Sequence, residues 1–252
     1  MKLRLIKNNS TQHKISSKES NISTIGIQSL ETKYSSLEKS GLFVLSSPTT
    51  QIARSFIVQT ILNNTDNKTA LLSFEDHCDL FSLCPDKTSK LMSLYRGGAL
   101  SFNFVYIEEY KDFFNKIKND ITGKKFDDYD LIIIDIYQDI FLSMPERELN
   151  FLLTSWQSWF LNENKICIWS VYGDQATQVI NTKFTQFNNV FNGLSYIDYY
   201  NNSEVFYDII FWHLKSSVQA NISLKLQFDE DNSQLSVDSE LNKLPSVAST
   251  KI

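Results

Sequence analysis

The sequence predicts an α/β fold, a three-layer sandwich whose mixed, mostly parallel sheet ends in an antiparallel meander. Short apolar runs typical of strands alternate with stretches of helical spacing as far as about residue 187. After Gly193 the apolar period changes to two, which indicates consecutive strands. Residues 131–134 are continuously apolar and β-branched or Leu, as expected of a central parallel strand covered on both faces.

The predicted elements follow one another without a linker that would divide the chain. Predicted strands cover residues 42–45, 70–74, 102–107, 131–134, 165–171, 194–200, 205–214 and 220–228, and predicted helices cover residues 52–62, 88–95, 110–121, 143–160 and 176–187. Ser143 followed by Glu146, with Pro145 between them, predicts a capping box at the start of the long helix. We therefore predict a single domain over residues 22–237, between flexible polar tails at residues 1–21 and 238–252.

This order of elements is that of RecA-like ATPase cores, in which the first strand leads into a glycine-rich phosphate-binding loop. The chain has seven glycines in 252 residues, and no two have the spacing of either standard phosphate-binding motif. Residues 45–51 read Leu-Ser-Ser-Pro-Thr-Thr-Gln, without glycine or lysine. The prediction is a P-loop-NTPase-like fold without the P-loop, and a protein that is not an enzyme.

A divergent nucleotide-binding protein is the alternative, and it would use five residues: Ser47, Thr49, Arg54, Glu75 and Asp135. Glu75 and Asp135 follow predicted strands, whose carboxyl ends line the ligand crevice of such sheets together with Asp76 and Asp139. Asp135 stands where NTPases place the carboxylate that holds a magnesium-bound water. The competing interpretations are a solvated or salt-bridged Arg54 and a carboxylate that only returns the strand to solvent.

Composition excludes several classes of function. The net charge is −5 and there is no basic run, so we expect no nucleic-acid partner. The three cysteines, Cys78, Cys84 and Cys167, are odd in number and typical of reduced thiols in a cytoplasmic protein. No apolar run approaches 18 residues, so no membrane span is expected. We expect no cofactor and no metal site, because His77 and Cys78 lack further ligands at suitable spacing.

Aromatic residues are concentrated in two predicted strands, at 194–200 and 205–214. The candidates for an interaction surface are Tyr199, Tyr207, Phe211 and Trp212. The alternative is that helices cover both faces of the sheet and that every ring is core. Alternation of side chains along a strand favours some exposure of these rings.

Several short strings resemble the N-terminal region of the BcsE family, accessory proteins of bacterial cellulose secretion. They are Ile-Gly-Ile-Gln-Ser-Leu at residues 25–30, Gly-Leu-Phe-Val at 41–44, Trp156 and Trp159 in the long helix, and Asp-Ile-Ile-Phe-Trp at 208–212. The resemblance extends from about residue 22 to about residue 228. It implies a degenerate, catalytically silent NTPase-like module that regulates or scaffolds exopolysaccharide secretion, and hence biofilm formation, through protein contacts.

The resemblance also implies the partners. They are other cellulose-secretion subunits, including a small membrane-anchored protein and subunits that regulate the synthase, with a homodimer as a further expectation. The family binds cyclic di-GMP through an Arg-x-x-Asp motif in a C-terminal domain. None of the four arginines here is followed three residues later by Asp, so we expect no direct binding of cyclic di-GMP. The expected location is cytoplasmic, peripheral at the inner membrane through partners.

Overall fold

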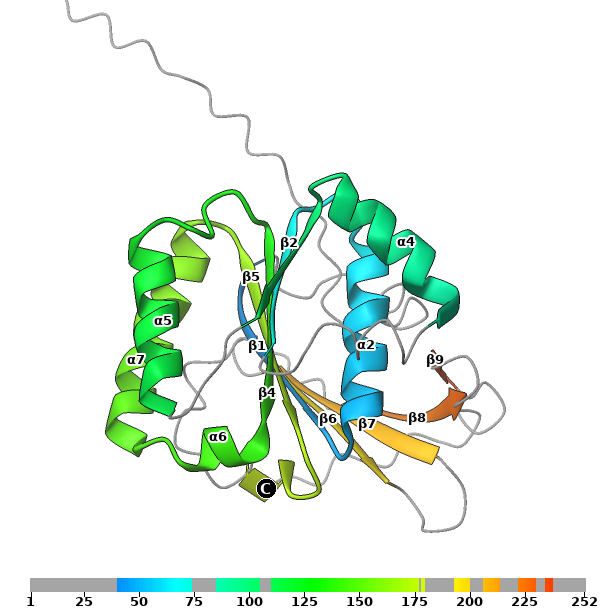
Figure 1. Cartoon of the computed structure of the whole chain (residues 1–252). Coiled ribbons are helices and arrows are strands. Elements are labelled where there is room, and N and C mark those ends of the chain that lie inside the picture. Colours follow the sequence, from blue (N-terminus) through cyan, green and yellow to red (C-terminus); the bar gives the residue numbers. More distant parts are fainter. Residues whose placement is uncertain are drawn as a thin grey trace, which may run out of the picture.

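In the computed structural model of this chain, a nine-stranded sheet carries helices on both faces (Figure 1). The structure describes residues 40–73, 85–104, 110–176, 178–179, 193–199, 206–213, 222–229 and 234–237. The strands are β1 Gly41–Ser47, β2 Thr69–Ser73, β3 Leu100–Phe104, β4 Leu131–Tyr137, β5 Ile166–Tyr172, β6 Gly193–Tyr199, β7 Phe206–His213, β8 Ile222–Asp229 and β9 Gln234–Val237. The helices are α2 Thr50–Asn63, α4 Pro85–Arg96, α5 Tyr110–Thr122, α6 Gln138–Leu142 and α7 Glu146–Asn162.

The strand order confirms the predicted mixed sheet. It runs β3-β2-β4-β5-β1-β6-β7-β8-β9. Neighbouring strands from β3 to β6 are parallel, and the pairs β6–β7, β7–β8 and β8–β9 are antiparallel. The apolar strand β4 lies between β2 and β5, as its continuous burial requires.

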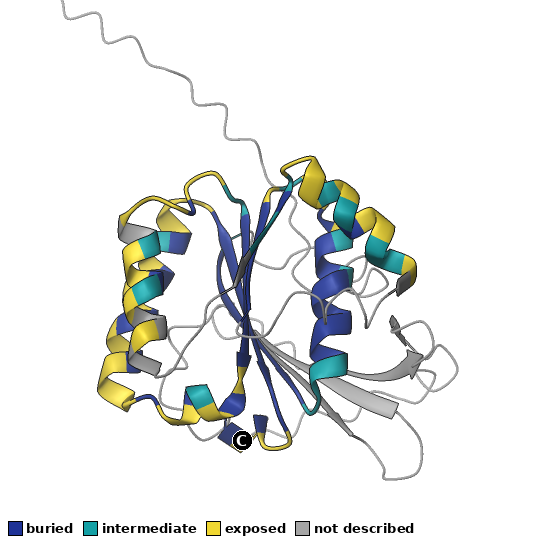
Figure 2. Ribbon diagram, in the orientation of Figure 1, coloured by how far each residue is buried: buried dark blue, intermediate teal, exposed yellow. Residues whose placement is uncertain are grey.

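Two hydrophobic cores lie on opposite faces of the parallel strands. Helices α5, α6 and α7 cover one face, while α2 and α4 cover the other (Figures 1 and 2). The first core packs α7 against even-numbered residues of β1, β2 and β4, such as Ile132 and Ile134, and against odd-numbered residues of β5, such as Trp169. The second packs α2 against odd-numbered residues such as Leu71 and Ile133. Alternation along each strand therefore assigns one set of residues to each helical layer.

Helix α2 is buried over almost its whole circumference. Its residues 52–58 are all buried, which a helix packed on one side only would not allow. Figure 1 shows the antiparallel strands β7 and β8 near the lower end of this helix and β9 beside it, and β9 contacts α2. The last strands of the sheet thus place α2 in the interior of the domain.

Most predicted elements are confirmed with shifted ends, but three details were wrong or missed. The capping box at Ser143 is wrong: Pro145 is the N-cap of α7, and the Ser143 hydroxyl donates to the carbonyl of Ile140, 2.7 Å away. Helix α6 was not predicted. Strand β9 lies in a polar segment that the sequence analysis did not assign to the sheet, yet it pairs with β8. The predicted tails at residues 1–21 and 238–252 lie outside the described residues, as does most of the helix predicted at 176–187.

Lys165 holds the turn between α5 and β4 against the start of β5. Its Nζ donates to the carbonyl oxygens of Phe126, Asp127 and Tyr129 at 3.0, 2.6 and 2.7 Å. Three acceptors match the three donors of an ammonium group. Burial lowers the pKa of Lys165 below its ordinary value of 10.5, and nearby carboxylates, Asp127 first among them, act in the opposite direction.

We expect Lys165→Met to lower the free energy of unfolding by about 2 to 4 kcal/mol, because three carbonyl groups lose a charged donor. Lys124→Met, at an exposed lysine of the same turn, is the matched control and should change stability by no more than about 0.5 kcal/mol. Urea denaturation measures both. Equal effects of the two substitutions would mean that the Lys165 hydrogen bonds contribute nothing specific.

Candidate functional site

The connection from β1 to α2 takes the place of a phosphate-binding loop, and it is short. Strand β1 ends at Ser47 and α2 begins at Thr50, so only Pro48 and Thr49 lie between them. Thr49 is the N-cap: its Oγ1 accepts from the backbone N–H of Ile52 at 3.3 Å, and its carbonyl accepts from the Ser47 hydroxyl at 2.9 Å. A standard P-loop has four residues between its two glycines. This connection is therefore too short to encircle a phosphate group.

Asp135 occupies the centre of a polar row across the carboxyl ends of three strands. The strand register aligns it with Ser73 of β2 on one side and Ser170 of β5 on the other, and all three residues are buried. On the face covered by α2 they follow the apolar residues Leu71, Ile133 and Ile168 of the same three strands. This row is the part of the sheet where an NTPase of this topology carries its magnesium-binding carboxylate.

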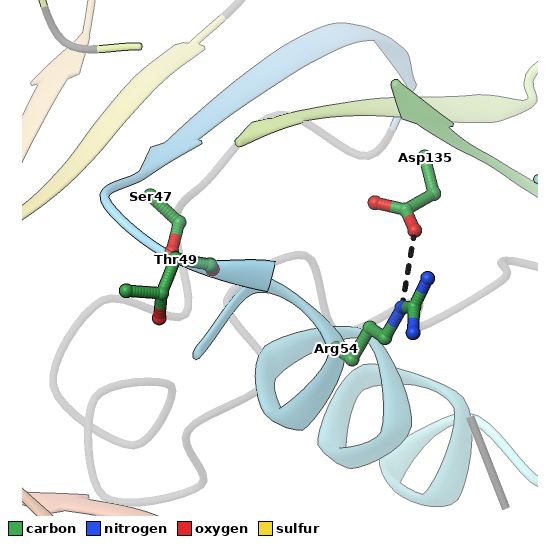
Figure 3. A network of polar contacts seen from close by, with 4 residues as sticks. All are labelled: Ser47, Thr49, Arg54 and Asp135. Atoms are coloured by element: carbon green, nitrogen blue, oxygen red, sulfur yellow. Dashed lines mark hydrogen bonds and ion pairs between the residues drawn. The ribbon is translucent and has the colours of Figure 1, made fainter. Parts of the chain in front are cut away.

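Arg54 reaches from α2 to this carboxylate (Figure 3). Its Nε lies 3.8 Å from Oδ2 of Asp135, and the two side chains are only 4% and 3% exposed. At that separation the contact is an ion pair and not a hydrogen bond. The sequence left open whether Arg54 contacts a nucleotide, is solvated or forms a salt bridge. In the structure it forms a salt bridge, and it is buried and not solvated.

The pair changes what Asp135 can do chemically. A divalent cation bound to this carboxylate would lie close to the guanidinium charge, and in a buried site that repulsion is weakly screened. The carboxylate already has a positive charge beside it from within the chain. Arg54 thus makes binding of a metal ion at Oδ2 of Asp135 electrostatically unfavourable.

Side chains also close the neighbouring carboxyl ends of β4 and β5. The Gln138 amide donates to Asp174 Oδ1 at 2.6 Å, and its Oε1 accepts from the backbone N–H of Gln175 at 2.8 Å. Gly173 lies between these partners with φ of +142°, and a Cβ there would come within 2.3 Å of the Gln138 side chain. The Gly173 N–H donates to the carbonyl of Ser47 at 3.0 Å. The ends of β1, β4 and β5 are therefore tied together.

This second network was not predicted from the sequence. Its one visible signal is Gly173, which follows directly on a strand in a chain with few glycines. Nothing in the spacing of Gln138 and Asp174, 36 residues apart, indicates that they meet.

The remaining predicted site residues are only partly placed. Glu75, with its neighbours Asp76, His77 and Cys78, lies outside the described residues. Asp139 is exposed on α6, so it does not share the buried environment of Asp135. Cys167 is a free, buried thiol, and burial raises its pKa well above 9.0. Within the described part of the chain, no three His, Cys, Asp or Glu side chains gather as a metal site.

The four aromatic candidates lie in two paired strands. In the antiparallel register Tyr199 of β6 is opposite Tyr207 of β7, Phe211 is opposite Ser195, and Trp212 is opposite Leu194. The side chains of these strands are outside what the structure describes. In the described helices, no segment is both long and apolar enough to cross a membrane.

With this geometry in place, comparison with known families gives a match over most of the chain. The model of the cellulose biosynthesis protein BcsE, N-terminal domain, matches residues 20–236. The chain belongs to this BcsE family. Membership confirms the resemblance and implies involvement in cellulose biosynthesis. Comparison with curated proteins gives no match.

Comparison with solved structures establishes the fold class. The KaiC-like protein of the hyperthermophilic archaeon Pyrococcus horikoshii OT3 is similar with a TM-score of 0.55 and 11% sequence identity. The similarity covers 79% of this chain and 89% of the archaeal chain. This BcsE-family chain therefore has a RecA-like fold, as the order of elements predicted.

We expect a double-mutant cycle to show that Arg54 and Asp135 are coupled. Arg54→Met should lower the free energy of unfolding by about 3 to 5 kcal/mol, because it leaves a buried carboxylate without its cation. The double variant Arg54→Met/Asp135→Asn should lose about 1 to 3 kcal/mol less than the sum of the single changes. Chemical denaturation measures all four proteins.

The exposed pair Lys125–Asp120, with 3.2 Å between Nζ and Oδ2, is the control for that cycle. Lys125→Met should cost less than about 1 kcal/mol, because its side chain is 41% exposed and the pair is screened by solvent. Additive single effects at Arg54 and Asp135 would contradict a coupled pair.

We expect Gly173→Ala to destabilise the domain more than Gly98→Ala. Both glycines have positive φ, +142° and +75°, but a Cβ at Gly98 meets nothing within 4 Å. Gly98→Ala should therefore cost only backbone strain, about 1 to 2 kcal/mol, whereas Gly173→Ala must also displace Gln138. Thermal unfolding compares the two, and equal melting temperatures would mean that Gln138 moves aside freely.

Proposed function

We propose that this BcsE-family chain is a non-catalytic regulatory scaffold of the cellulose secretion system. It acts through contacts with other secretion subunits, including a small membrane-anchored protein and subunits that regulate the synthase. The observation that carries the proposal is the buried Arg54–Asp135 pair beneath a two-residue β1–α2 connection. A nucleotide enzyme of this topology needs a phosphate cradle and a carboxylate available to magnesium.

Two further features support the proposal, because they argue against a small-molecule ligand and against a nucleic-acid partner. The carboxyl ends of β1, β4 and β5 are tied by Gln138 and by the Gly173–Ser47 hydrogen bond, where a ligand crevice would open in an active relative. The net charge of −5 gives no support to a nucleic-acid partner. In this proposal the protein works in the cytoplasm and reaches the inner membrane through its partners.

A complementation experiment separates a scaffold from an enzyme. In a strain lacking the protein, Arg54→Met/Asp135→Asn should restore as much cellulose output as an equal amount of folded wild-type protein, because a scaffold does not use the Asp135 carboxylate for chemistry. An enzyme that uses Asp135 to hold magnesium would lose activity in the same variant. A folded double variant that fails to restore cellulose output would contradict the proposal.

Two binding measurements complete the test. Tagged wild-type protein should co-purify with cellulose-secretion subunits, with the tag alone as control. ATP with magnesium should leave the melting temperature unchanged, since a ligand at a hundredfold its Kd would add about 2.7 kcal/mol to the free energy of unfolding. Failure to bind any secretion subunit, or clear stabilisation by ATP, would overturn the assignment.

A further inference from the structure

The polar row at the carboxyl ends of the strands contains a buried hydroxyl group that has no acceptor in the part of the chain that the structure describes. It belongs to Ser170 of β5, which is 0% exposed and whose Oγ makes no hydrogen bond there. An unpaired buried hydroxyl destabilises a folded protein, and most buried polar groups have a partner. Ser170 therefore points to a ligand with which its hydroxyl bonds.

The neighbours of Ser170 decide on which side that ligand lies. In the parallel register Ser170 is aligned with Asp135 of β4 on one side and with Leu45 of β1 on the other, and both are buried. Leu45 has an apolar side chain, whereas a carboxylate accepts hydrogen bonds at about four positions. Adjacent strands lie about 4.8 Å apart, so one small molecule can bond to Ser170 and Asp135 together.

Small side chains leave room for such a molecule. Ile133 and Ile168 directly precede Asp135 and Ser170 on the same face, and they fill the layer beneath α2. A serine side chain is much smaller than an isoleucine side chain, and Ser73 continues the row on the other side of Asp135. The layer thus contains less side-chain volume at the row, and a water molecule needs a space of only about 10 to 15 Å³.

The ion pair between Arg54 and Asp135 favours a neutral ligand. Nε of Arg54 lies 3.8 Å from Oδ2 of Asp135 (Figure 3). A cation bound beside the carboxylate would be repelled by the guanidinium, and an anion would be repelled by the carboxylate. A ligand that accepts from the Ser170 hydroxyl and donates to the carboxylate needs both a lone pair and a polar hydrogen. Water is the smallest neutral molecule that has both.

Two tyrosines cover the row beyond the strand ends. Tyr137 and Tyr172 are the next residues on the same face after Asp135 and Ser170, they are aligned in the register, and their ring centroids lie 5.6 Å apart. Tyr172 is only 2% exposed. The rings enclose the row, so the space suits a resident water molecule and not a larger ligand taken from solution.

We propose that a buried water molecule bridges Oγ of Ser170 and the carboxylate of Asp135, as a permanent part of the buried ion pair. The Ser170 hydroxyl donates to the water oxygen, and the water donates to the carboxylate. That second bond is charge-assisted, and Nε of Arg54 at 3.8 Å is too distant to supply one. The proposal is independent of the scaffold function, because its tests concern only hydration and stability.

The effect of Ser170→Ala on stability tests the bridge by its sign. Removal of a hydroxyl that bonds a resident water should raise the equilibrium constant of unfolding about three- to tenfold, because a hydrogen bond is lost. Removal of an unpaired hydroxyl should lower that constant. Ser47→Ala is the matched control: Ser47 is another buried serine at a strand end, and its hydroxyl donates to the Thr49 carbonyl at 2.9 Å. It should also raise the constant.

Urea denaturation of the full chain measures both variants. A Ser170→Ala protein that is more stable than the wild type, while Ser47→Ala is less stable, would overturn the proposal.

A high-resolution crystal structure of the full chain tests the position of the water. We expect an electron-density peak about 2.6 to 3.0 Å from both Ser170 Oγ and a carboxylate oxygen of Asp135. In Ser170→Val the hydroxyl is replaced by a methyl group and a second methyl group is added, so the peak should be absent. A direct hydrogen bond between Ser170 and Asp135, no peak in the wild type, or a peak that persists in Ser170→Val contradicts the bridge.

Discussion

The ion pair between Arg54 and Asp135 is the contact that the rest of the domain must accommodate. Burying two charges costs several kcal/mol for each ion, and only close pairing offsets that cost. The pair therefore favours the rotation of α2 that turns Arg54 toward the end of β4. Because α2 is buried on almost all sides, its position in turn determines how β9 packs against it at the far edge of the sheet.

The same contact explains how a RecA-like fold can persist in a chain that we propose is not an enzyme. In an active NTPase the carboxylate at this position acts on a bound metal, so its charge is balanced only when ligand is present. Here the balancing charge is supplied by the neighbouring helix. A buried carboxylate left without any cation would destabilise the sheet, whereas paired with Arg54 it becomes part of the core. Loss of a ligand and retention of the fold are thus compatible.

The sequence contains much of the fold but little of the site. Residues 131–134 and the alternation from Ile222 to Phe228 predict strands because burial on two faces or one dictates their pattern. Periodicity cannot show that the arginine of α2 meets the aspartate of β4, 81 positions later, since that contact depends on the strand order. Strand β9 was missed because its four residues, Gln-Leu-Ser-Val, are too few for their alternation to stand out in a polar segment. Pro145 displaced Ser143 as the N-cap because the preceding helix α6 uses that serine as its C-cap.

Because side chains close the carboxyl edge of the sheet, the surfaces that remain for contacts with partners are ones that an NTPase core does not need for chemistry. Helix α7 packs one side on Trp169 and the apolar residues of β4, so its fold-determining positions are all on that side. The opposite side is free to vary, and a monomer gains solubility from charges there. Seven of the thirteen uncharged residues at 150–162 are exposed, and the fold does not require those seven to be uncharged. Their hydroxyl groups already donate to acceptors within the helix, so covering this face with another protein would leave none of these donors unpaired.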